Sequence, residues 1–314
     1  MQVFRSLADI PDMPGRSVVA IGNFDGVHCG HQAILAEVRK RGQMRGAVSV
    51  AVTFDPHPVR VLRPEMAPKL ITPMPQRLEL LAQTGIDATL ILPFTEEFSQ
   101  TPAYDFADQV LARALRAVEV HEGESFRFGR DAEAGTEDLI RFGKQLGFGV
   151  FGHRALMVRG ITVSSSEVRQ RIVAGNTSLA RALLGRAFSI ESTQERGRGV
   201  GSKLLVPTIN LAPYAELTPA NGVYVTRVRV GERWFEAVTN CGVRPTFGVE
   251  SYAIESYLLN FEPVEIEPET PVEVCFLARL REEQKFPSAE ALKEQIIHDV
   301  AKAKRYHGLA AASR

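Results

Sequence analysis

Two histidines stand three residues apart in a glycine-rich segment that follows a short β-branched run, Gly22-Asn23-Phe24-Asp25-Gly26-Val27-His28-Cys29-Gly30-His31. Glycines let the backbone approach a ligand closely, and the free N–H groups at a helix start favour an anion. Imidazoles in such a place donate hydrogen bonds to phosphate oxygens and become charged when a polyphosphate raises their pKa. We therefore interpret this segment as a phosphate site. A metal site is the weaker alternative, because no third ligand stands at a recognised spacing.

A second candidate phosphate site lies at the expected start of a later helix, at Ser164, Ser165 and Ser166. Serine hydroxyls cap backbone N–H groups there, and the same end of a helix binds anions. Arg169 follows about one turn later, and its guanidinium can hold a phosphate through two parallel hydrogen bonds. Capping alone explains many serines at helix starts, so this segment is informative mainly in combination with the first one.

The second half of the chain has a glycine-rich run that contains Gly197 and Gly201, followed by Thr208 and Asn210. A glycine-rich loop before a strand can cover phosphates. Thr208 and Asn210 are two residues apart, so on a strand they share one face, and both offer oxygen ligands that suit Mg²⁺ beside ATP. A turn followed by a half-buried strand gives the same pattern, so this signal is weak by itself.

The elements that position these residues alternate between strand and helix in the first half. Apolar periodicity predicts strands at 17–21, 47–54, 86–92 and 150–158 and helices at 31–41, 75–83, 102–117 and 167–174. This alternation is typical of a parallel sheet with helices on both faces, an α/β fold in which ligands bind at the carboxyl edge of the sheet. The glycine–histidine segment follows the first of these strands directly.

After residue 185 the pattern changes to short strands separated by turn residues. We expect strands at 204–211, 222–230, 233–239, 253–261 and 271–278, and a helix with one apolar face at 288–303. These elements indicate an antiparallel β-barrel or sandwich that carries a terminal helix. We place the two domains at 1–183 and 184–314.

The composition limits the classes of function. The 314 residues include 37 Lys+Arg and 37 Asp+Glu, a net charge of zero that favours small-molecule partners over nucleic acid or membranes. With 45% hydrophobic and 24% charged residues, disordered and fibrous classes are excluded. The 3 cysteines are widely spaced, and no signal peptide or membrane span is expected, so we predict a cytoplasmic protein.

The pattern GxFDGxHxGH resembles the signature of nucleotidyltransferases, and in its longer form that of the prokaryotic bifunctional riboflavin kinase/FAD synthetase family. Three further segments follow in the family's order: Thr53-Phe54-Asp55-Pro56-His57-Pro58, GESFRFG at 123–129, and VSSSEVR at 163–169. The family usually has Asp or Asn where this chain has Ser125. Taken alone, the prolines fit a rigid loop and the aromatics Phe126 and Phe128 a hydrophobic core.

The resemblance implies that the first half transfers AMP from ATP to FMN, which forms FAD and releases pyrophosphate, with Mg²⁺ neutralising the polyphosphate. His28 and His31 would stabilise charge on the transferring phosphorus. ATP would be held by Gly22, Asn23, Phe24, Asp25, Gly26, Gly30, Ser164, Ser165 and Arg169. The flavin would be held by Asp55, Pro56, His57, Pro58, Ser125, Phe126 and Phe128.

The second half resembles the riboflavin kinase part of the same family, through Pro207-Thr208-Ile209-Asn210 and the later segments 221–224, 242–247, 255–261 and 281–286. The resemblance implies phosphorylation of riboflavin to FMN. Gly197 and Gly201 would bind ATP, Thr208 and Asn210 would bind Mg²⁺ and ATP, and Glu255 would be the general base for the riboflavin 5′-hydroxyl. The chain departs from the family pattern at Ser202, Leu205 and Tyr257, where the family has Arg, Gly and His.

Three hypotheses follow. The leading one is a bifunctional enzyme acting on riboflavin, FMN and ATP and producing FAD. The alternatives are an FMN adenylyltransferase with an inactive kinase-like domain, motivated by the departures, and a flavin-binding module without catalysis. Intact His28, His31, Ser164 and Arg169 favour an enzyme, because a simple binding module does not need to hold both ends of a triphosphate.

Overall fold

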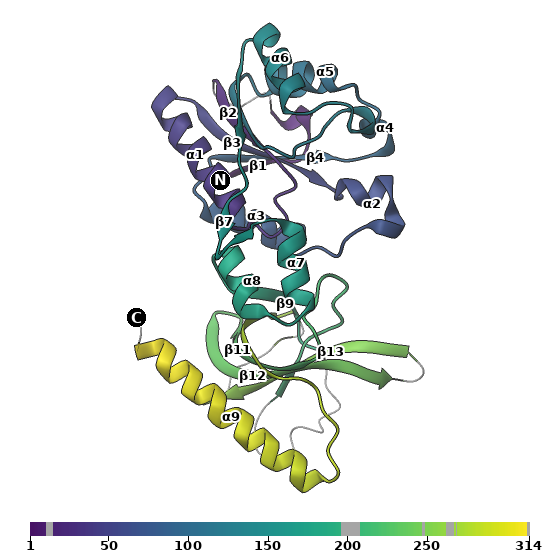
Figure 1. Cartoon of the computed structure of the whole chain (residues 1–314), viewed down its shortest axis with the longest axis vertical. Helices are drawn as coiled ribbons and strands as arrows, with labels where there is room; N and C mark the ends of the chain where they lie inside the picture. The colour runs from purple at the N-terminus through teal and green to yellow at the C-terminus, as the bar shows by residue number, and fades with distance from the viewer. Residues whose placement is uncertain (11–14, 196–207, 247–248, 262–266, 268, 313–314) are drawn as a thin grey trace. The chain divides into compact units, whose positions relative to one another are not determined.

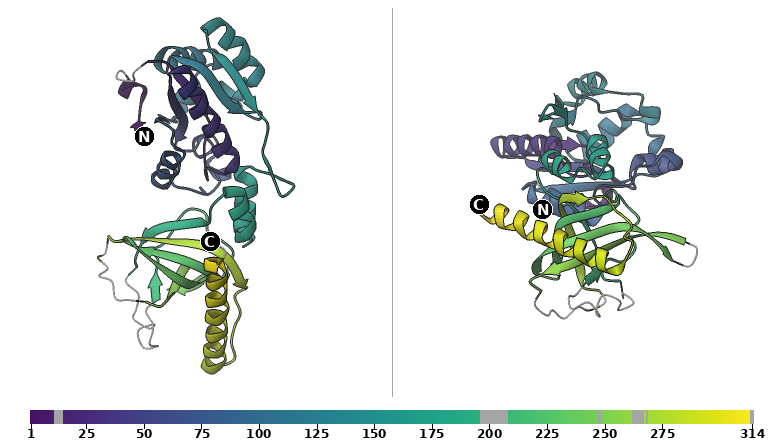
Figure 2. Two further views of the ribbon diagram at one scale, coloured as in Figure 1. Left: turned by 90° about the vertical axis from the view of Figure 1, so that its left-hand side faces the viewer. Right: turned by 60° about the horizontal axis from the view of Figure 1, so that its bottom comes forward.

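The computed structural model describes residues 1–10, 15–195, 208–246, 249–261, 267 and 269–312 (Figures 1 and 2). The chain forms two compact units, residues 1–165 and residues 166–314. Each unit contains one six-stranded sheet. Across the described ranges, no helix is long and apolar enough to cross a lipid bilayer.

The first unit is built on a sheet with the strand order β1-β4-β3-β2-β5-β6, in which every neighbouring pair is parallel. Its strands are β1 (Gln2–Phe4), β2 (Ser17–Ile21), β3 (Val48–Asp55), β4 (Ala88–Pro93), β5 (Ala117–Gly123) and β6 (Gly149–His153). The chain proceeds from β2 to β3 on one side and later returns to β5 on the other. The carboxyl ends of β2 and β5 therefore flank the switch point, where open α/β sheets bind ligands.

Helices cover both faces of this sheet (Figure 1). They are α1 (Cys29–Arg45), α2 (Pro58–Leu62), α3 (Met74–Gln83), α4 (Glu96–Ser99), α5 (Ala103–Phe106), the π-helical segment η3 (Ala107–Ala114) and α6 (Thr136–Leu146). Short 3-10 turns lie at Leu7–Asp9, Pro64–Met66 and Arg130–Ala132. A small hairpin is formed by β7 (Met157–Val158) and β8 (Ile161–Thr162). One core packs Leu35 of α1 and Leu81 of α3 on Val18 and Ala51. The opposite core packs η3 and α6 on the sheet, so a layer of apolar contacts fixes each face.

The second unit is an antiparallel barrel with the order β10-β13-β12-β11-β14-β9. Its elements are α7 (Ser165–Val173, which begins at the end of the first unit), α8 (Thr177–Leu184), β9 (Phe188–Thr193), β10 (Thr208–Asn210), β11 (Gly222–Val230), β12 (Arg233–Thr246), β13 (Val249–Leu259), β14 (Pro271–Arg281) and α9 (Ala289–Ala312). Hydrogen bonds from Glu195 N to Asn210 O and from Ala212 N to Thr193 O, both 2.9 Å, close the sheet on itself.

The terminal helix α9 lies against the outside of this barrel (Figure 2). Ala303 of α9 is fully buried in a cluster with Val223, Val225 and Val238. Arg281 Nε donates to the buried Asp299 Oδ2 at 2.9 Å, which adds an ion pair between β14 and α9. Packing and this pair together fix the helix on the barrel.

The expected fold class is confirmed: an α/β unit with a parallel sheet and helices on both faces, and an antiparallel barrel with a terminal helix. Several expected elements were wrong in detail. The single helix expected at 102–117 is divided between α5 and η3, and a left-handed turn at Arg116 (φ 46°) then starts β5. The strand expected at 150–158 ends at His153. Helices α6 and α8 and strands β1 and β9 were not expected, and residues 204–207 lie outside the described ranges.

Two buried carboxylates of β5 have opposite surroundings. Glu119 accepts two hydrogen bonds from Arg41, at 2.8 and 2.9 Å, and pairs with Arg45. Burial alone would raise the pKa of Glu119, but the hydrogen bonds from Arg41, Arg45 and His121 lower it below its ordinary value. Glu122 is fully buried, and neither of its carboxylate oxygens has a hydrogen-bond partner among the described residues. Burial raises the pKa of Glu122 to about 7.

We predict that Glu122 makes the protein less stable as the pH rises. The folded protein holds this proton up to a pKa of about 7, whereas the unfolded chain releases it near the ordinary value of 4.5, so the free energy of unfolding falls as the pH rises between these values. Glu122→Gln removes the effect. The variant should match the parent near pH 4.5 and exceed its unfolding free energy by about 3 kcal/mol near pH 8.

Urea unfolding at both pH values measures this difference. Glu137→Gln is the matched control, because Glu137 is an exposed acid on the neighbouring helix α6. A stability gain from Glu122→Gln that is equal at both pH values would contradict the prediction.

Candidate active sites

The loop after β2 is held in an unusual backbone conformation. Gly22 N donates to Val52 O at 3.0 Å, and Thr53 Oγ1 donates to Asn23 O at 3.1 Å, so the loop is fastened to β3. Phe24 (φ 48°) and Val27 (φ 38°) occupy the left-handed region, which is unfavourable for residues with side chains and is concentrated at functional sites. The sequence Gly22–Gly30 therefore forms a fixed loop at the carboxyl edge of the sheet.

The carboxylate of Asp25 is the anchor of this loop. It is 1% exposed and accepts hydrogen bonds from the backbone N–H groups of Ile71, at 3.1 Å, and Thr72, at 3.0 Å. Thr72 Oγ1 in turn accepts from Gly26 N at 2.9 Å, and the buried Arg77 places Nη2 3.9 Å from Asp25 Oδ1. The structure thus places the Asp25 side chain, predicted to bind ATP, among protein donors.

The two histidines lie at the point where the loop becomes α1. His28 is the N-cap of α1, and its Nδ1 accepts a hydrogen bond from His31 N at 3.3 Å. Their rings are stacked with centroids 3.6 Å apart, and the edge of Phe24 meets His31 at 5.2 Å. A Cβ on Gly30 would lie 3.3 Å from the His28 ring, so glycine permits this close approach.

His31 is suited to an anionic ligand. Burial, together with the neighbouring His28 and Arg77, lowers the pKa of His31 well below its ordinary value. Within the described part of the chain, the buried His31 Nδ1 has no hydrogen-bond partner. An arriving phosphate would provide such a partner and would favour the protonated imidazole.

The serine segment meets this loop directly. Ser165 begins α7, and its Oγ donates to Asp25 O at 2.8 Å. Ser164 precedes the helix and is half-buried, and Arg169 lies four residues after Ser165 on the same helix. The structure therefore brings the two predicted phosphate segments together at Ser165 and Asp25, which are 140 residues apart in the sequence.

The predicted flavin residues lie in the loops that follow β3 and β5. After β3, Asp55 and Pro56 are exposed, and the buried His57 caps α2, of which Pro58 is the first residue, by accepting from Val59 N at 3.3 Å. Both loops flank the one after β2, because β3 and β5 are the neighbours of β2 in the sheet.

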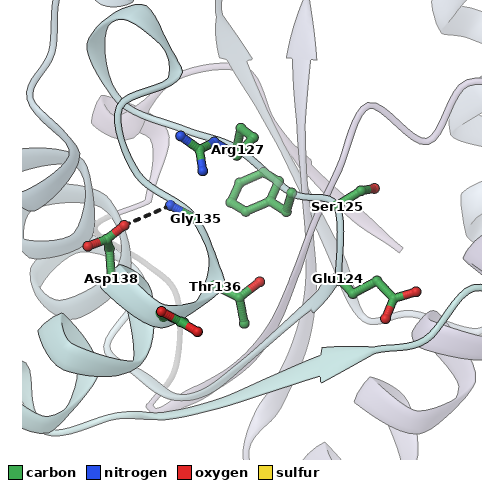
Figure 3. A pocket seen from close by; sticks show the side chains of 8 residues that line it. Glu124, Ser125, Arg127, Gly135, Thr136 and Asp138 are labelled. Carbon is green, nitrogen blue, oxygen red and sulfur yellow. Dashed lines mark hydrogen bonds between the residues drawn. The ribbon is translucent and has the colours of Figure 1, made fainter.

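A cavity of about 450 Å³ opens beside the loop after β5 (Figure 3). It is lined by Glu124, Ser125, Phe126, Arg127, Gly135, Thr136, Glu137 and Asp138. Phe128 is not a lining residue: it is buried in the core beneath, stacked on Phe126 at 5.4 Å and close to Phe106 at 5.8 Å. The structure thus divides the two aromatics between a pocket wall, Phe126, and its support, Phe128.

In the barrel, three polar residues share one row across adjacent strands. Glu255 of β13 is directly opposite Asn210 of β10 on one side and Asn240 of β12 on the other. Residues in register on neighbouring strands place their side chains on the same face. Thr208 is opposite Tyr257 in the next outward-facing row. Gly197 and Gly201 lie outside the described residues.

Asn210 Oδ1 is buried, and among the residues described it has no hydrogen-bond partner. An oxygen acceptor without a donor is what a hard cation such as Mg²⁺ uses as a ligand. The neighbouring Thr208 hydroxyl and Glu255 carboxylate also offer only oxygen. The donor set of this row therefore fits Mg²⁺ beside ATP.

Comparison with known proteins gives matches over both units. The pattern of the FAD synthetase family matches residues 10–167, and that of the riboflavin kinase family matches residues 184–307. A bifunctional riboflavin kinase/FMN adenylyltransferase of Pseudomonas fluorescens is 35% identical over 305 residues, which are 97% of each chain. The chain belongs to the bifunctional riboflavin kinase/FMN adenylyltransferase family. The Escherichia coli K12 relative of the same description is 31% identical and covers 98% of this chain and 99% of its own.

A solved structure extends the likeness to the fold. A crystal structure described as a macrolide-efflux protein from Streptococcus pneumoniae has a TM-score of 0.86 and 27% identity, and it covers 96% of this chain and 98% of its own. The resemblance predicted from the four segments of the first half and from the second half is therefore confirmed.

The family assignment gives the departure at Tyr257 a structural context. Tyr257 packs on the apolar cluster that also holds Val300 and Tyr306 of α9. Its ring thus supports the contact between the barrel and the terminal helix, a packing role that an imidazole would fill with less apolar surface. The departures at Ser202 and Leu205 lie outside the described residues.

Sequence reasoning missed several residues of these sites. Thr72 and Arg77 hold Asp25 from a segment about 47 residues away, and Asn240 reaches the row of Glu255 from another strand. The helix expected at 75–83 is α3, which contains Arg77, but that expectation did not mark Arg77 or the preceding Thr72 as residues of the site. Their contacts with Asp25 depend on the three-dimensional fold and have no local signal.

We predict that Asp25→Asn loosens the loop. The amide nitrogen of Asn would face the N–H donors of Ile71 or Thr72, so at least one buried hydrogen bond is lost, at about 2 kcal/mol of stability. Hydrogen–deuterium exchange should become faster at residues 22–30 and at Ile71 and Thr72. Asp9→Asn is the control, since Asp9 caps a backbone N–H of Arg5 at an exposed position. Unchanged exchange in the loop would show that Asp25 does not hold it.

Proposed function

We propose that this chain carries out two ATP-dependent steps: it phosphorylates riboflavin to FMN in the barrel and adenylylates FMN to FAD in the parallel-sheet unit. The observation that carries the proposal is the contact between the loop of His28 and His31 and the start of α7 through Ser165 and Asp25. This contact supports the proposal, because a nucleotidyl transfer needs the two segments that we expect to bind phosphate near the same edge of the sheet. We keep the domain boundary at 183/184, which the riboflavin kinase match from residue 184 supports.

In the adenylylation step, an oxygen of the FMN phosphate attacks the α-phosphorus of ATP, and the bond from that phosphorus to the β-phosphate oxygen breaks. Pyrophosphate leaves, and no protein nucleophile is needed. His28 and His31 donate hydrogen bonds to the α-phosphate as its charge shifts. His31 is suited to this because its buried Nδ1 has no partner among the described residues and because its lowered pKa rises when the polyphosphate binds.

The other ATP contacts follow from the loop and from α7. The backbone of Gly22, Asn23, Phe24, Gly26 and Gly30 surrounds the nucleotide, while the Asp25 carboxylate keeps the loop in shape. Ser164, Ser165 and Arg169 hold the outer phosphates at the start of α7, where N–H groups and a guanidinium favour anions. Mg²⁺ bound with ATP supplies charge neutralisation.

The flavin contacts flank the same edge. The isoalloxazine ring enters the cavity beside Ser125 and Phe126, and Phe128 supports Phe126 from the core. The segment Asp55-Pro56-His57-Pro58 borders the flavin from the loop after β3. A flat aromatic ring gains favourable stacking and burial against Phe126.

In the kinase step, Glu255 accepts the proton of the riboflavin 5′-hydroxyl as that oxygen attacks the γ-phosphorus of ATP, and ADP leaves. Thr208 and Asn210 hold Mg²⁺, which supplies charge neutralisation on the phosphates. The support is Asn210 Oδ1, which is buried without a hydrogen-bond partner in the described part of the chain and whose residue is in register with Glu255. We further propose that Gly197 and Gly201 cover the phosphates and that both steps take place in the cytoplasm.

We predict that single substitutions separate the two steps. His28→Ala should abolish FAD formation and leave FMN formation intact, whereas Glu255→Gln should reduce FMN formation by about 100-fold or more and leave FMN conversion to FAD intact. Purified variants are incubated with ATP and Mg²⁺ and either riboflavin or FMN, and the flavins are separated by chromatography. His298→Ala, on α9, is the control histidine variant.

Conversion of FMN but not of riboflavin by the unmodified chain would identify an adenylyltransferase with an inactive kinase unit. Conversion of neither flavin would leave a flavin-binding module. Loss of FMN formation in a folded His28→Ala variant would contradict two independent sites.

A further inference from the structure

Thr136 lines the cavity of Figure 3, and its hydroxyl lies near the buried Glu122. Glu122 of β5 is directly opposite Gly152 of β6. Gly152 has no side chain, and a Cβ added to it would lie 3.3 Å from Thr136 Cγ2. The Thr136 side chain therefore occupies the space over Gly152, next to Glu122 on the same face of the sheet. Thr136 is the first residue of α6 and lines the cavity, whereas Glu122 is fully buried. Thr136 therefore lies between the buried carboxyl and the cavity.

Both side chains have unused hydrogen-bonding capacity. All three oxygens are buried, and within the described residues none of them makes a hydrogen bond of standard geometry, although the Thr136 hydroxyl lies close enough to Glu122 to act on its pKa. Burial raises the pKa of Glu122 to about 7, and the nearby Thr136 hydroxyl opposes that rise. A buried polar group without a partner is unfavourable, so a ligand that supplies one here is favoured.

The charged groups on the surrounding elements do not account for this behaviour of Glu122. On β5 itself, Glu119 and His121 pair with each other. On the neighbouring elements, the charged or titratable groups include His153 on β6, Glu124 and Arg127 in the loop, and Asp108 with Arg113 on η3, which pair with each other. Helix α6 carries Glu137, Asp138, Arg141 and Lys144. None of them contributes to the shifted pKa of Glu122, whose causes are burial and Thr136.

We propose that Thr136 hydrogen-bonds the pyrimidine edge of the flavin ring and that Glu122 is a positioning residue that sets whether Thr136 donates or accepts. This inference rests on the proposed function, because it takes the cavity as the flavin site. Phe126 on the wall suits the flat ring. Three carboxylates, of Glu124, Glu137 and Asp138, line the cavity against one guanidinium, of Arg127, so the lining is net negative and favours entry of the ring over the FMN phosphate.

The two protonation states of Glu122 give Thr136 opposite roles. A carboxylate only accepts, so ionised Glu122 takes the Thr136 hydroxyl proton, and Thr136 then accepts from the flavin N3–H. A protonated Glu122 can donate to Thr136 Oγ1, and the hydroxyl then donates to a flavin carbonyl. The pyrimidine edge offers both an N–H and carbonyls, so FMN binds in both states. A flavin methylated at N3 fits only the second.

The test compares the dissociation constants of FMN and of N3-methyl-FMN, measured by flavin fluorescence at about pH 5.5 and about pH 8.5, on either side of the shifted pKa. The ratio of the two constants cancels the titration of the phosphate and of the histidines, which both ligands share. We expect the preference for FMN to be about fivefold greater at the higher pH, the size of one hydrogen bond.

The variants separate positioning from mere packing. Glu122→Gln should bind both flavins with a ratio that no longer changes with pH, and so should Thr136→Val. Thr136→Ser keeps the hydroxyl and should restore the change. Glu137→Gln removes an exposed carboxylate from the same cavity; it can change both dissociation constants, but their ratio should still change with pH as in the parent.

A ratio in the unmodified chain that does not change with pH, while FMN still binds, overturns this inference and leaves the proposed function standing. The same follows if Glu137→Gln abolishes the change as fully as Glu122→Gln does. Absence of FMN binding to the unmodified chain overturns both.

Discussion

The first unit depends on one buried carboxylate. Asp25 is 1% exposed and receives hydrogen bonds from Ile71 N and Thr72 N, while its own carbonyl receives one from Ser165 Oγ. These contacts join three segments that are distant in the sequence: the loop after β2, the approach to α3 and the start of α7. Hydrogen bonds to an ionised, buried acceptor are stronger than neutral ones, which lets them hold Phe24 and Val27 in a left-handed backbone. The stacked pair His28 and His31 follows from that backbone.

The parallel sheet supplies the rest of the arrangement. The loops after β3, β2 and β5 lie side by side because their strands are neighbours, and all of them emerge at the same edge. Asp55 and Phe126 are about seventy residues apart in the sequence. In the sheet, the loops that carry them lie on either side of the loop after β2. A site for two substrates can therefore be built from short segments, each anchored on a strand that is buried on both faces.

The sequence predicted the features that have a signal in neighbouring residues and missed those that depend on contacts between distant residues. Strand β2 and helix α1 carry local signals, namely apolar periodicity, glycines and cap residues, and the structure contains both. The break between η3 and β5 was missed because Arg116 adopts a left-handed turn without being glycine or asparagine. Thr72, Arg77 and Thr136 act through contacts with distant residues, which periodicity does not encode. Phe128 was assigned to the flavin by family position, yet its place in the core follows from packing with Phe106.

Under the proposed function, the two units hold phosphates by different physical means. In the parallel-sheet unit, helix starts, backbone N–H groups and imidazoles offer donors, so an anion is met by hydrogen-bond donors and positive potential. In the barrel, the side-chain oxygens of Asn210 and Glu255 lie in one row of antiparallel strands, and a carboxylate only accepts, so a cation between this row and an anion offsets their repulsion. The pairing of β10, β13 and β12 aligns Asn210, Glu255 and Asn240 in one straight row across the strands. A single helix cannot align three side chains in this way. The change of fold class between the units thus matches a change in how phosphate charge is neutralised.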